Sequence, residues 1–454
     1  MQVDKWLEKQ YTKHTTYLVN LTKHLCVYMI FVVYSILFVE KGRETVRVDK
    51  FTLASVNKRL VLETVRDLGP INKAEVARIT ALSIPTVVKI MTEMEGNKII
   101  RPCGWQGSNG GKRAQLYEFA GDAFFSIGVD IGRTNVKAVA MNLSGRILNT
   151  VSIPTADTLP EQQMITRVST LIMQCASDKG LSAKTLLGIG IGMPGILDTQ
   201  KGMVLFSPNF QWENIDLITP LRKQLKIQDL YIQLENSNRA LALGEYYFGA
   251  GKDSGYMVCI NLGYGIGSAI ISGGDFYTGS SGTSGEFGHI TVEKDGPLCT
   301  CGNNGCLEAV ASGRAIAQQA HNLIDSGVVT NVTQFTDGGS GIVEAKTVFA
   351  AAENGDEASR DLVRKAGEYI GIGLASYINI LDPERIVLAG GMANAHVLKQ
   401  QIRQTVKVRQ MRFAGRRVTI KTTLLGADAT AVGAAALILK RLIEAGGDTN
   451  LKNE

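Results

Sequence analysis

The sequence predicts a small helix-turn-helix region followed by a body of two similar α/β lobes, and two observations lead to this fold class. Two short helical segments, each preceded by a capping residue, are joined by a tight turn within residues 73–95. Further along, a glycine-rich strand–turn–strand pattern occurs twice, at residues 127–139 and again at residues 259–270. Such a duplication favours two lobes of similar plan with a cleft between them.

Charge divides the chain at the same place as the patterns. Its 454 residues are enough for roughly three domains, and 45% apolar with 20% charged residues is an ordinary globular composition. Residues 1–119 carry 18 Lys and Arg against 11 Asp and Glu, whereas residues 120–454 carry 30 against 31. A basic N-terminal part followed by a neutral body suggests that the N-terminal part has an anionic partner, namely nucleic acid.

Residues 1–50 form an atypical extension. An apolar run at 25–39 is shorter than the ~18–20 residues that span a bilayer. Lys23 precedes this run but no small-residue cleavage site follows it, so a signal peptide is a poor match and a membrane anchor stays an alternative. We favour the hypothesis that translation normally starts near Val46 or Val48, so that the extension is not natively made; N-terminal sequencing tests this.

Residues 51–119 are expected to form a winged helix-turn-helix domain. Asn72 can cap a helix over 73–79, and Ser83 can cap a second helix over 84–95. In the later helix one stripe is expected to be buried, and it consists of Ile84, Val87, Val88, Met91 and Met94. The other stripe holds Thr86, Lys89 and Glu93. Thr86 and Lys89 are the candidates for reading DNA bases, because this helix would enter the major groove.

A basic hairpin follows these helices. Strands are expected at 98–101 and 114–119, with a turn at 108–111. No acidic residue lies between 97 and 113 to oppose its cations, which are Lys98, Arg101, Lys112 and Arg113. Lys112 and Arg113 are expected to grip DNA phosphate or to enter the minor groove, in a homodimer that reads a pseudo-palindrome. The alternative is a solvated surface hairpin on a protein-binding domain.

The loop at 286–308 has the composition of a metal site. Its four candidate ligands, one imidazole and three thiolates, are His289, Cys299, Cys301 and Cys306. Tetrahedral zinc prefers these ligands, and a closed set of this kind is structural. Glu286 and Glu308 bracket the set and would suit a polyol or sugar. Inert reduced thiols are the alternative; disulfides are disfavoured because nothing else in the chain indicates secretion.

Three further features have structural interpretations. The basic run at 403–421 is expected to be a solvated face, or otherwise a contact with a subunit or DNA. His321 and His396 are expected at the surface or at helix caps rather than on a metal. Residues 428–437 indicate a closely packed helix with small side chains, N-capped by Asp428.

With these residues the chain resembles the ROK family of repressors, open reading frames and sugar kinases, in its repressor branch. The resemblance runs from about Leu53 to Leu442. Its motifs are Asp130-Ile-Gly, Gly192-Met-Pro-Gly195, Glu235-Asn236, Gly244-Glu245, Glu286-x-Gly-His289, the cysteine set through Glu308, and Leu388-Ala-Gly-Gly391. It implies an actin-like, hexokinase-type (ribonuclease H-like) body with a first lobe at 123–240, joined by a C-terminal helix at 428–445, and a second lobe at 241–427.

The resemblance also implies ligand contacts. Family kinases hold the sugar through positions that match Asn236, Glu286, His289 and Glu308 here. It implies one structural zinc per chain on His289 and the three cysteines. One ring nitrogen of this histidine would ligate zinc while the other faces the sugar.

Three departures from the kinase pattern predict the function. Ser237 stands where the kinases have the aspartate that acts as general base, and loss of a general base costs about 10²–10⁴ in rate. Arg133 and Tyr264 replace a glycine and a threonine in the two phosphate turns. We therefore expect no catalytic residue and no ATP, but a cytoplasmic, sugar-responsive repressor of carbohydrate-uptake or catabolic genes.

The expected partners follow from this function. They are operator DNA, a sugar or sugar phosphate effector, and a second copy of the chain in a homodimer or higher oligomer. A sugar-transport protein that sets the DNA affinity is a weaker possibility. The alternative function is a ROK-type sugar kinase that carries an attached DNA-binding domain.

Overall fold

The computed structural model describes residues 50–107, 113–155, 160–227, 229–336, 342–413 and 417–452. By its contacts the chain divides into two units, Met1–Asn57 and Lys58–Glu454. The apolar run at 25–39 and the suggested start at Val46 or Val48 lie outside the described residues. Within the described part, no helix is both long and apolar enough to cross a membrane.

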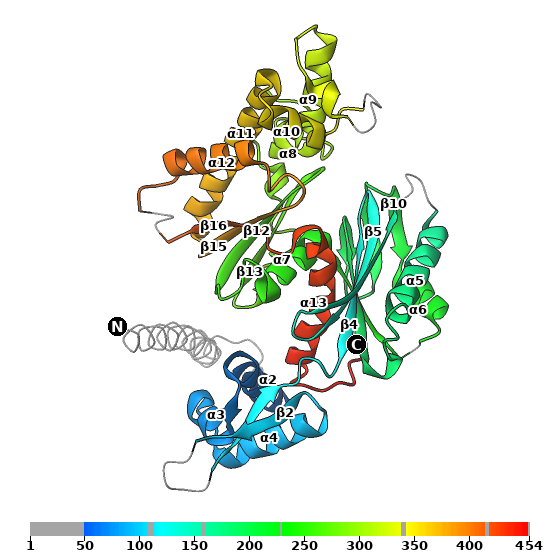
Figure 1. The fold of residues 1–454 in the computed structure, drawn as a ribbon, viewed down its shortest axis with the longest axis vertical. Helices are drawn as coiled ribbons and strands as arrows, with labels where there is room; N and C mark the ends of the chain where they lie inside the picture. Colours follow the sequence, from blue (N-terminus) through cyan, green and yellow to red (C-terminus); the bar gives the residue numbers. More distant parts are fainter. Residues whose placement is uncertain are drawn as a thin grey trace, which may run out of the picture. The chain divides into compact units, whose positions relative to one another are not determined.

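The N-terminal region consists of helices and a small antiparallel sheet with the strand order β1-β3-β2. Its elements, blue to cyan in Figure 1, are α2 (Lys50–Leu68), β1 (Ile71–Asn72), α3 (Lys73–Thr80), α4 (Ile84–Gly96), β2 (Ile100–Trp105) and β3 (Gln115–Phe119). Asn72 Oδ1 accepts a hydrogen bond from the Glu75 amide at 2.9 Å. Ser83 Oγ accepts one from the Thr86 amide at 3.3 Å. Both predicted helix caps are therefore confirmed.

The buried face of α4 differs from the predicted stripe. Val87, Met91 and Met94 are buried as expected, and Ile90 joins them. Ile84 and Val88, in contrast, are 57% and 39% exposed. At 100° per residue, Val88 lies about 110° from the middle of the buried stripe and Ile84 about 70°. The prediction was wrong for these two residues because it took an apolar stripe wider than the surface that α4 buries.

The first large sheet has the order β11-β7-β4-β5-β6. Its strands are β4 (Phe125–Ile131), β5 (Asn135–Asn142), β6 (Ile147–Pro154), β7 (Leu186–Met193) and β11 (Tyr231–Asn236). Two helices, α5 (Glu161–Ser177) and α6 (Ile218–Leu225), share a core with one face of the sheet. The other face packs against α13 (Ala429–Glu444). A sheet covered on both faces explains why its central strands β4 and β7 are buried almost throughout.

A second large sheet repeats this plan with the order β14-β13-β12-β15-β16. Its strands are β12 (Tyr256–Leu262), β13 (Ile266–Ser272), β14 (Asp275–Phe276), β15 (Arg385–Ala389) and β16 (Thr419–Thr422). In each sheet an antiparallel hairpin lies on one side of the first strand and parallel strands lie on the other. The helices that enclose its core are α8 (Leu307–Ala311), α9 (Gly313–Asp325), α10 (Ala345–Glu353), α11 (Glu357–Leu381) and α12 (His396–Arg409). The two glycine patterns thus open two similar α/β units, as predicted.

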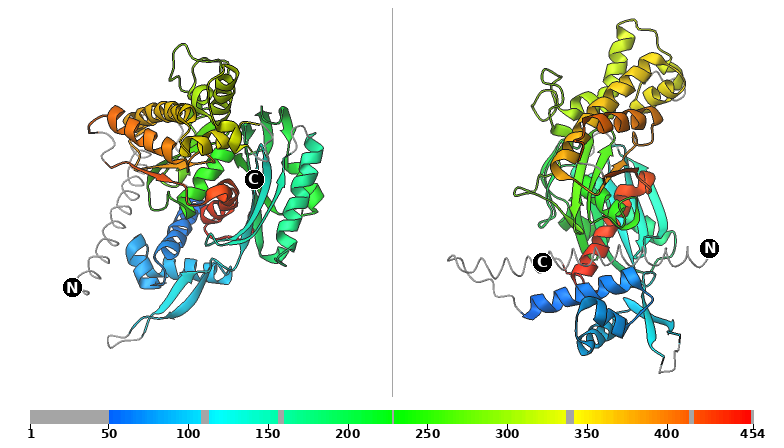
Figure 2. Two further views of the ribbon diagram at one scale, coloured as in Figure 1. Left: turned by 45° about the horizontal axis from the view of Figure 1, so that its top comes forward. Right: turned by 90° about the vertical axis from the view of Figure 1, so that its left-hand side faces the viewer.

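Between the two large sheets lie α13 and α7 (Ser237–Phe248), and Figures 1 and 2 show α13 in red between the green and cyan strands. The two helices approach closely, since a Cβ on Gly433 would lie 1.7 Å from the Ala240 carbonyl oxygen. The predicted close packing of the last helix is confirmed. Asp428 stands at the N-cap position of α13, as predicted, but its side chain makes no capping bond. Its carboxylate accepts from Lys137 Nζ at 2.7 Å instead.

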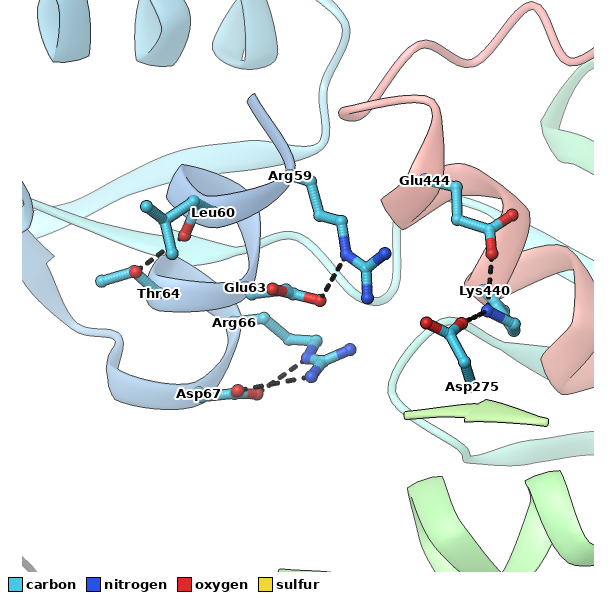
Figure 3. Close-up of polar contacts among 9 residues, drawn as sticks. All are labelled: Arg59, Leu60, Glu63, Thr64, Arg66, Asp67, Asp275, Lys440 and Glu444. Atoms are coloured by element: carbon cyan, nitrogen blue, oxygen red, sulfur yellow. Dashed lines mark hydrogen bonds and ion pairs between the residues drawn. The ribbon is translucent and has the colours of Figure 1, made fainter. Parts of the chain in front are cut away.

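The C-terminal half of α13 shares a core with α2, through Ile438 and Leu442 on one side and Val61 and Val65 on the other. Figure 3 shows polar contacts at this junction, where Lys440 binds both Asp275 and Glu444. On α2, Arg59 pairs with Glu63 at 3.1 Å, and Arg66 pairs with Asp67 at 2.8 Å. The N-terminal region is therefore joined to the lobes by an apolar core with a charged rim.

Candidate functional site

The predicted metal ligands converge in space. One ligand atom from each of His289, Cys299, Cys301 and Cys306 lies within 4.8 Å of the other three. His289 Nδ1 is 3.6 Å from Cys299 Sγ, and the sulfurs of Cys301 and Cys306 are also 3.6 Å apart. Three sulfurs and one imidazole nitrogen at these spacings fit a tetrahedral zinc ion.

Local backbone geometry brings these ligands together. A 3-10 turn over Phe287–His289 presents the imidazole, and a bridge between Thr291 and Cys306 aligns the returning chain. Gly305 has a positive φ of 67°, and a Cβ there would lie 1.6 Å from the Glu293 carbonyl oxygen. Only glycine fits this position, so the tight loop depends on the glycine in its sequence.

The thiols differ in their electrostatic surroundings. The backbone amide of Asn303 lowers the pKa of Cys301 to about 7. Burial raises the pKa of the Cys306 thiol to about 12. Metal ligation requires the thiolate form, so a zinc ion would displace the proton that burial retains on Cys306.

His289 connects the metal ligands with a candidate sugar contact. Its Nδ1 faces Cys299, while its Nε2 lies 3.9 Å from Glu286 Oε2. The carboxylate of Glu286 is 65% exposed and so is available to a ligand. A metal on Nδ1 would fix the tautomer and leave Nε2 directed toward the same space as this carboxylate.

Glu308 and Asn236 are both held by the backbone of glycine motifs. Glu308 Oε2 accepts from the Ile266 amide at 2.9 Å, directly after the second glycine turn. Asn236 is the N-cap of α7: its Oδ1 accepts from the Asn238 amide at 2.9 Å, and its Nδ2 donates to the Gly195 carbonyl at 3.1 Å. These bonds fix the orientation of each side chain and use part of its hydrogen-bonding capacity.

Sequence reasoning missed several polar residues of this region. Arg239, in the first turn of α7, pairs at 3.5 Å with Glu235 near the end of β11, while its other nitrogen donates to the Gly282 carbonyl. Asn261 Nδ2 donates to Asn238 Oδ1 at 3.0 Å, which ties the second glycine turn to α7. Helical spacing indicates neither pair, because Glu235 and Asn261 lie on strands.

The two glycine turns contain a contact that the sequence did not predict. Arg133, after β4, stacks on the ring of Tyr264, after β12, with 4.2 Å from the guanidinium carbon to the ring centroid. In the first turn, burial raises the pKa of Asp130 to about 7, although Lys137 acts in the opposite direction. Two of the three departures from the kinase pattern, Arg133 and Tyr264, therefore touch each other.

The candidate DNA-contacting residues lie on exposed or partly exposed positions. Lys89 and Arg113 are exposed, and Thr86 is half-buried with its hydroxyl 2.7 Å from that of Ser83. Lys112 lies outside the described residues.

Arg101 is paired with acids in the structure, although no acidic residue lies between 97 and 113. This residue pairs with Glu118 at 2.8 Å and Asp122 at 2.7 Å. Glu118 lies opposite it in the β2–β3 register, outside the sequence window that was considered.

Comparisons with known proteins give a consistent result. The model of the ROK family matches residues 126–441. The chain is 30% identical to the DNA-binding transcriptional dual regulator NagC of Escherichia coli K12, covering 86% of this chain and 93% of NagC. It is 26% identical to the xylose repressor of Caldicellulosiruptor bescii, covering 86% and 97%.

Two solved structures resemble the fold. A ROK family transcriptional regulator, a homologue of the E. coli MLC protein, has a TM-score of 0.75 at 25% identity and covers 87% of this chain and 98% of its own. A ROK family glucokinase from Streptomyces griseus, solved with glucose and AMPPNP, has a TM-score of 0.60 at 32% identity. The glucokinase covers 69% of this chain and 98% of its own.

Proposed function

The chain belongs to the ROK family, and from that premise we propose that it is a sugar-responsive transcriptional repressor of genes for carbohydrate uptake or catabolism. One observation carries this proposal. The glucokinase covers 69% of the chain, whereas the solved regulator covers 87%, although each is matched over 98% of its own length. The chain therefore has a part that relatives named as repressors or regulators share and the kinase lacks.

The N-terminal region supports a winged helix-turn-helix. Two capped helices, α3 and α4, are joined by a turn through Ala81 in the left-handed conformation, and the β2–β3 hairpin follows. Thr86 and Lys89 would read bases from α4 in the major groove. Arg113, with Lys112 beside it in sequence, would contact phosphate from the hairpin. A homodimer would place two such helices on a pseudo-palindromic operator.

The proposed effector site uses Asn236, Glu286, His289 and Glu308. It is supported by the position of His289 between the thiols and Glu286, and by the attachment of Glu308 to the second glycine turn. Carboxylates, an amide and an imidazole are the groups that bind sugar hydroxyls through paired hydrogen bonds. The cysteine cluster would hold one structural zinc that keeps the histidine oriented.

We propose that the protein does not transfer phosphate. Ser237 begins α7 directly after the N-cap Asn236, at the position where family kinases place their general base. A serine hydroxyl remains protonated at neutral pH and cannot accept the proton of an attacking hydroxyl. A ROK-type kinase with an attached DNA-binding domain is the alternative.

Operator binding with and without sugar tests the proposal. Selection of DNA fragments that bind the purified protein gives the operator, and a thermal-shift screen over a sugar panel gives the effector. We expect one sugar to change the operator affinity. A coupled ATP assay on that sugar provides the opposing test: turnover at ordinary kinase rates, roughly 1–10³ per second, would show that the kinase alternative is correct.

A further inference from the structure

Arg133 and Tyr264 join two turns that belong to different sheets. The first turn connects β4 with β5 of one lobe, and the second connects β12 with β13 of the other. The guanidinium carbon of Arg133 lies over the Tyr264 ring, 4.2 Å from its centroid. This is cation–π geometry, for which about 6 Å is the usual limit.

The backbone of each turn is fixed without the help of this stack. In the first turn, Gly132 donates to the Asn135 carbonyl at 3.0 Å, and Thr155 Oγ1 donates to the Gly132 carbonyl at 2.7 Å. In the second turn, the amides of Gly313 and Arg314 at the start of α9 donate to the carbonyls of Gly263 and Tyr264. The turns thus hold both side chains in position, and shortening the side chains should leave the turns in place.

Glycine-containing turns of this kind allow a ligand to approach the backbone closely, and exposed amides of such turns are suited to phosphate. Here a guanidinium and a ring meet across the two turns, on side chains that are both exposed to solvent. We propose that Arg133 and Tyr264 form a clasp that occupies the space a nucleotide phosphate would need, so that the chain bridges its own turns in place of a nucleotide. The inference deepens the proposed function, since it rests on the chain being a regulator without phosphoryl transfer.

An arginine in this position has a second possible effect, which the experiment must separate. A guanidinium is a good phosphate ligand when its edge is free, so Arg133 alone would attract an anion. Stacking covers the face of the guanidinium and places the bulk of Tyr264 beside it. If the two side chains form a clasp, the unaltered protein should not bind nucleotide. If Arg133 instead forms an anion site, the unaltered protein should bind the nucleotide phosphates.

The test is a calorimetric titration of the full chain with MgADP. We expect no saturable binding by the unaltered protein up to about 1 mM, and binding at least about tenfold tighter by the R133G/Y264T variant, which opens both turns. R146G is the matched control, because it removes an exposed arginine from the neighbouring β5–β6 turn of the same sheet and should gain nothing. An R133G/Y264T protein that binds MgADP no better than the unaltered protein overturns the proposal, as does tight binding by the unaltered protein.

Two further measurements keep the outcome unambiguous. Operator affinity without sugar is measured on the same samples. If R133G/Y264T still binds operator but gains no affinity for MgADP, the clasp is wrong and the proposed function as a repressor is unaffected. If R133G/Y264T unfolds below the temperature of the titration, R133A and Y264A are titrated separately. Each should show part of the gain, and the absence of any gain in both contradicts the clasp.

Discussion

At the scale of single residues, His289 belongs to two candidate sites, the cysteine cluster and the proposed effector site. Its Nδ1 lies 3.6 Å from Cys299 Sγ and its Nε2 faces Glu286, so the orientation of one ring would serve both the proposed zinc site and the proposed effector site. The arrangement predicts that damage to the metal cluster impairs the sugar response before it impairs DNA binding, because the cysteine loop belongs to the second lobe and not to the N-terminal region.

Cys301→Ser tests this relation. Loss of one thiolate should release the zinc and disorder the loop at 286–308, because structural zinc contributes roughly 10–16 kcal/mol of apparent binding free energy in small peptides. We expect one zinc per chain in the unaltered protein and much less than one in the variant, measured by elemental analysis, together with loss of the sugar-induced thermal shift. Cys103→Ser, at an exposed position of β2, is the matched control. A metal-free protein with a full sugar response would contradict the prediction.

Glu286→Ala separates effector binding from DNA binding. The Glu286 carboxylate is exposed and its closest described ionic neighbour is His289, so its removal should leave the fold intact. Glu308 is less suitable, since its carboxylate also holds the Ile266 amide. We expect sugar affinity to fall by about tenfold or more while operator affinity is unchanged. Asp295→Ala, an exposed carboxylate of the same loop, should change neither affinity. Equal losses in the two variants would remove Glu286 from the site.

Asp130 should make stability depend on pH. Burial raises the pKa of this carboxyl from its ordinary 3.8 to about 7 in the folded chain. Between about pH 4 and pH 7 the folded chain therefore holds a proton that the unfolded chain has released. The free energy of unfolding falls as pH rises through this range, and the full loss is reached above about pH 7. Asp130→Asn should melt at a higher temperature than the unaltered protein at pH 8, with the difference shrinking toward pH 4. Asp178→Asn, exposed in the same lobe, is the control; parallel curves for Asp130→Asn and the unaltered protein would contradict the assignment.

At the scale of elements, the sequence predicted the features that depend on residues close together in the chain. The caps at Asn72 and Ser83 and the strands around both glycine turns depend on residues within a few positions of one another, and all are confirmed. The convergence of the four metal ligands also follows from a short loop.

What the sequence did not predict concerns partners that are distant in sequence. The side chain of the N-cap residue Asp428 makes no capping bond because Lys137, on a strand of the first sheet, binds its carboxylate. Arg101 is neutralised by Glu118 across the β2–β3 register. The contact between Arg133 and Tyr264 depends on how two lobes meet. Such pairings are set by tertiary packing, which neither periodicity nor spacing encodes.

The α4 helix and the hairpin should contribute to DNA binding in different ways. Lys89→Ala, on the exposed face of α4, should change sequence preference by roughly 1–3 kcal/mol at one base position, because it removes a base-reading contact. Arg113→Ala should weaken binding to all sequences alike and lower the slope of log affinity against log salt by about one. Fluorescence anisotropy on an operator and a scrambled duplex at several salt concentrations measures both. Lys184→Ala, in the first lobe, is the control. If Arg113→Ala altered sequence preference, the assignment of the hairpin would be incorrect.

At the scale of the whole molecule, α7 connects the proposed effector site with the N-terminal region. Its N-cap is Asn236, and near its other end the ring of Tyr247 lies under Arg66 of α2, with the guanidinium carbon 5.3 Å from the centroid. Along its length α7 packs on α13, which shares a core with α2. A shift of α7 at its first turn would therefore reach the proposed DNA-binding helices through packed side chains, which is one physical route for coupling between distant sites.

Sugar and operator should then influence each other by the same factor. A sugar can shift the protein only if it binds one arrangement of the lobes better than the other. If sugar induces the proposed repressor, the sugar-bound arrangement would hold the two proposed winged domains of a dimer poorly on their half-sites, so sugar would weaken operator binding. Thermodynamic linkage requires operator DNA to weaken sugar binding equally, by roughly 5- to 150-fold for typical allosteric proteins.

Sugar titrations with and without saturating operator measure this factor. Glu286→Ala should abolish the effect of sugar on operator affinity while leaving operator binding itself intact. Equal sugar affinity in the presence and absence of operator would eliminate induction by this route, whereas tighter sugar binding on the operator would identify the sugar as a co-repressor.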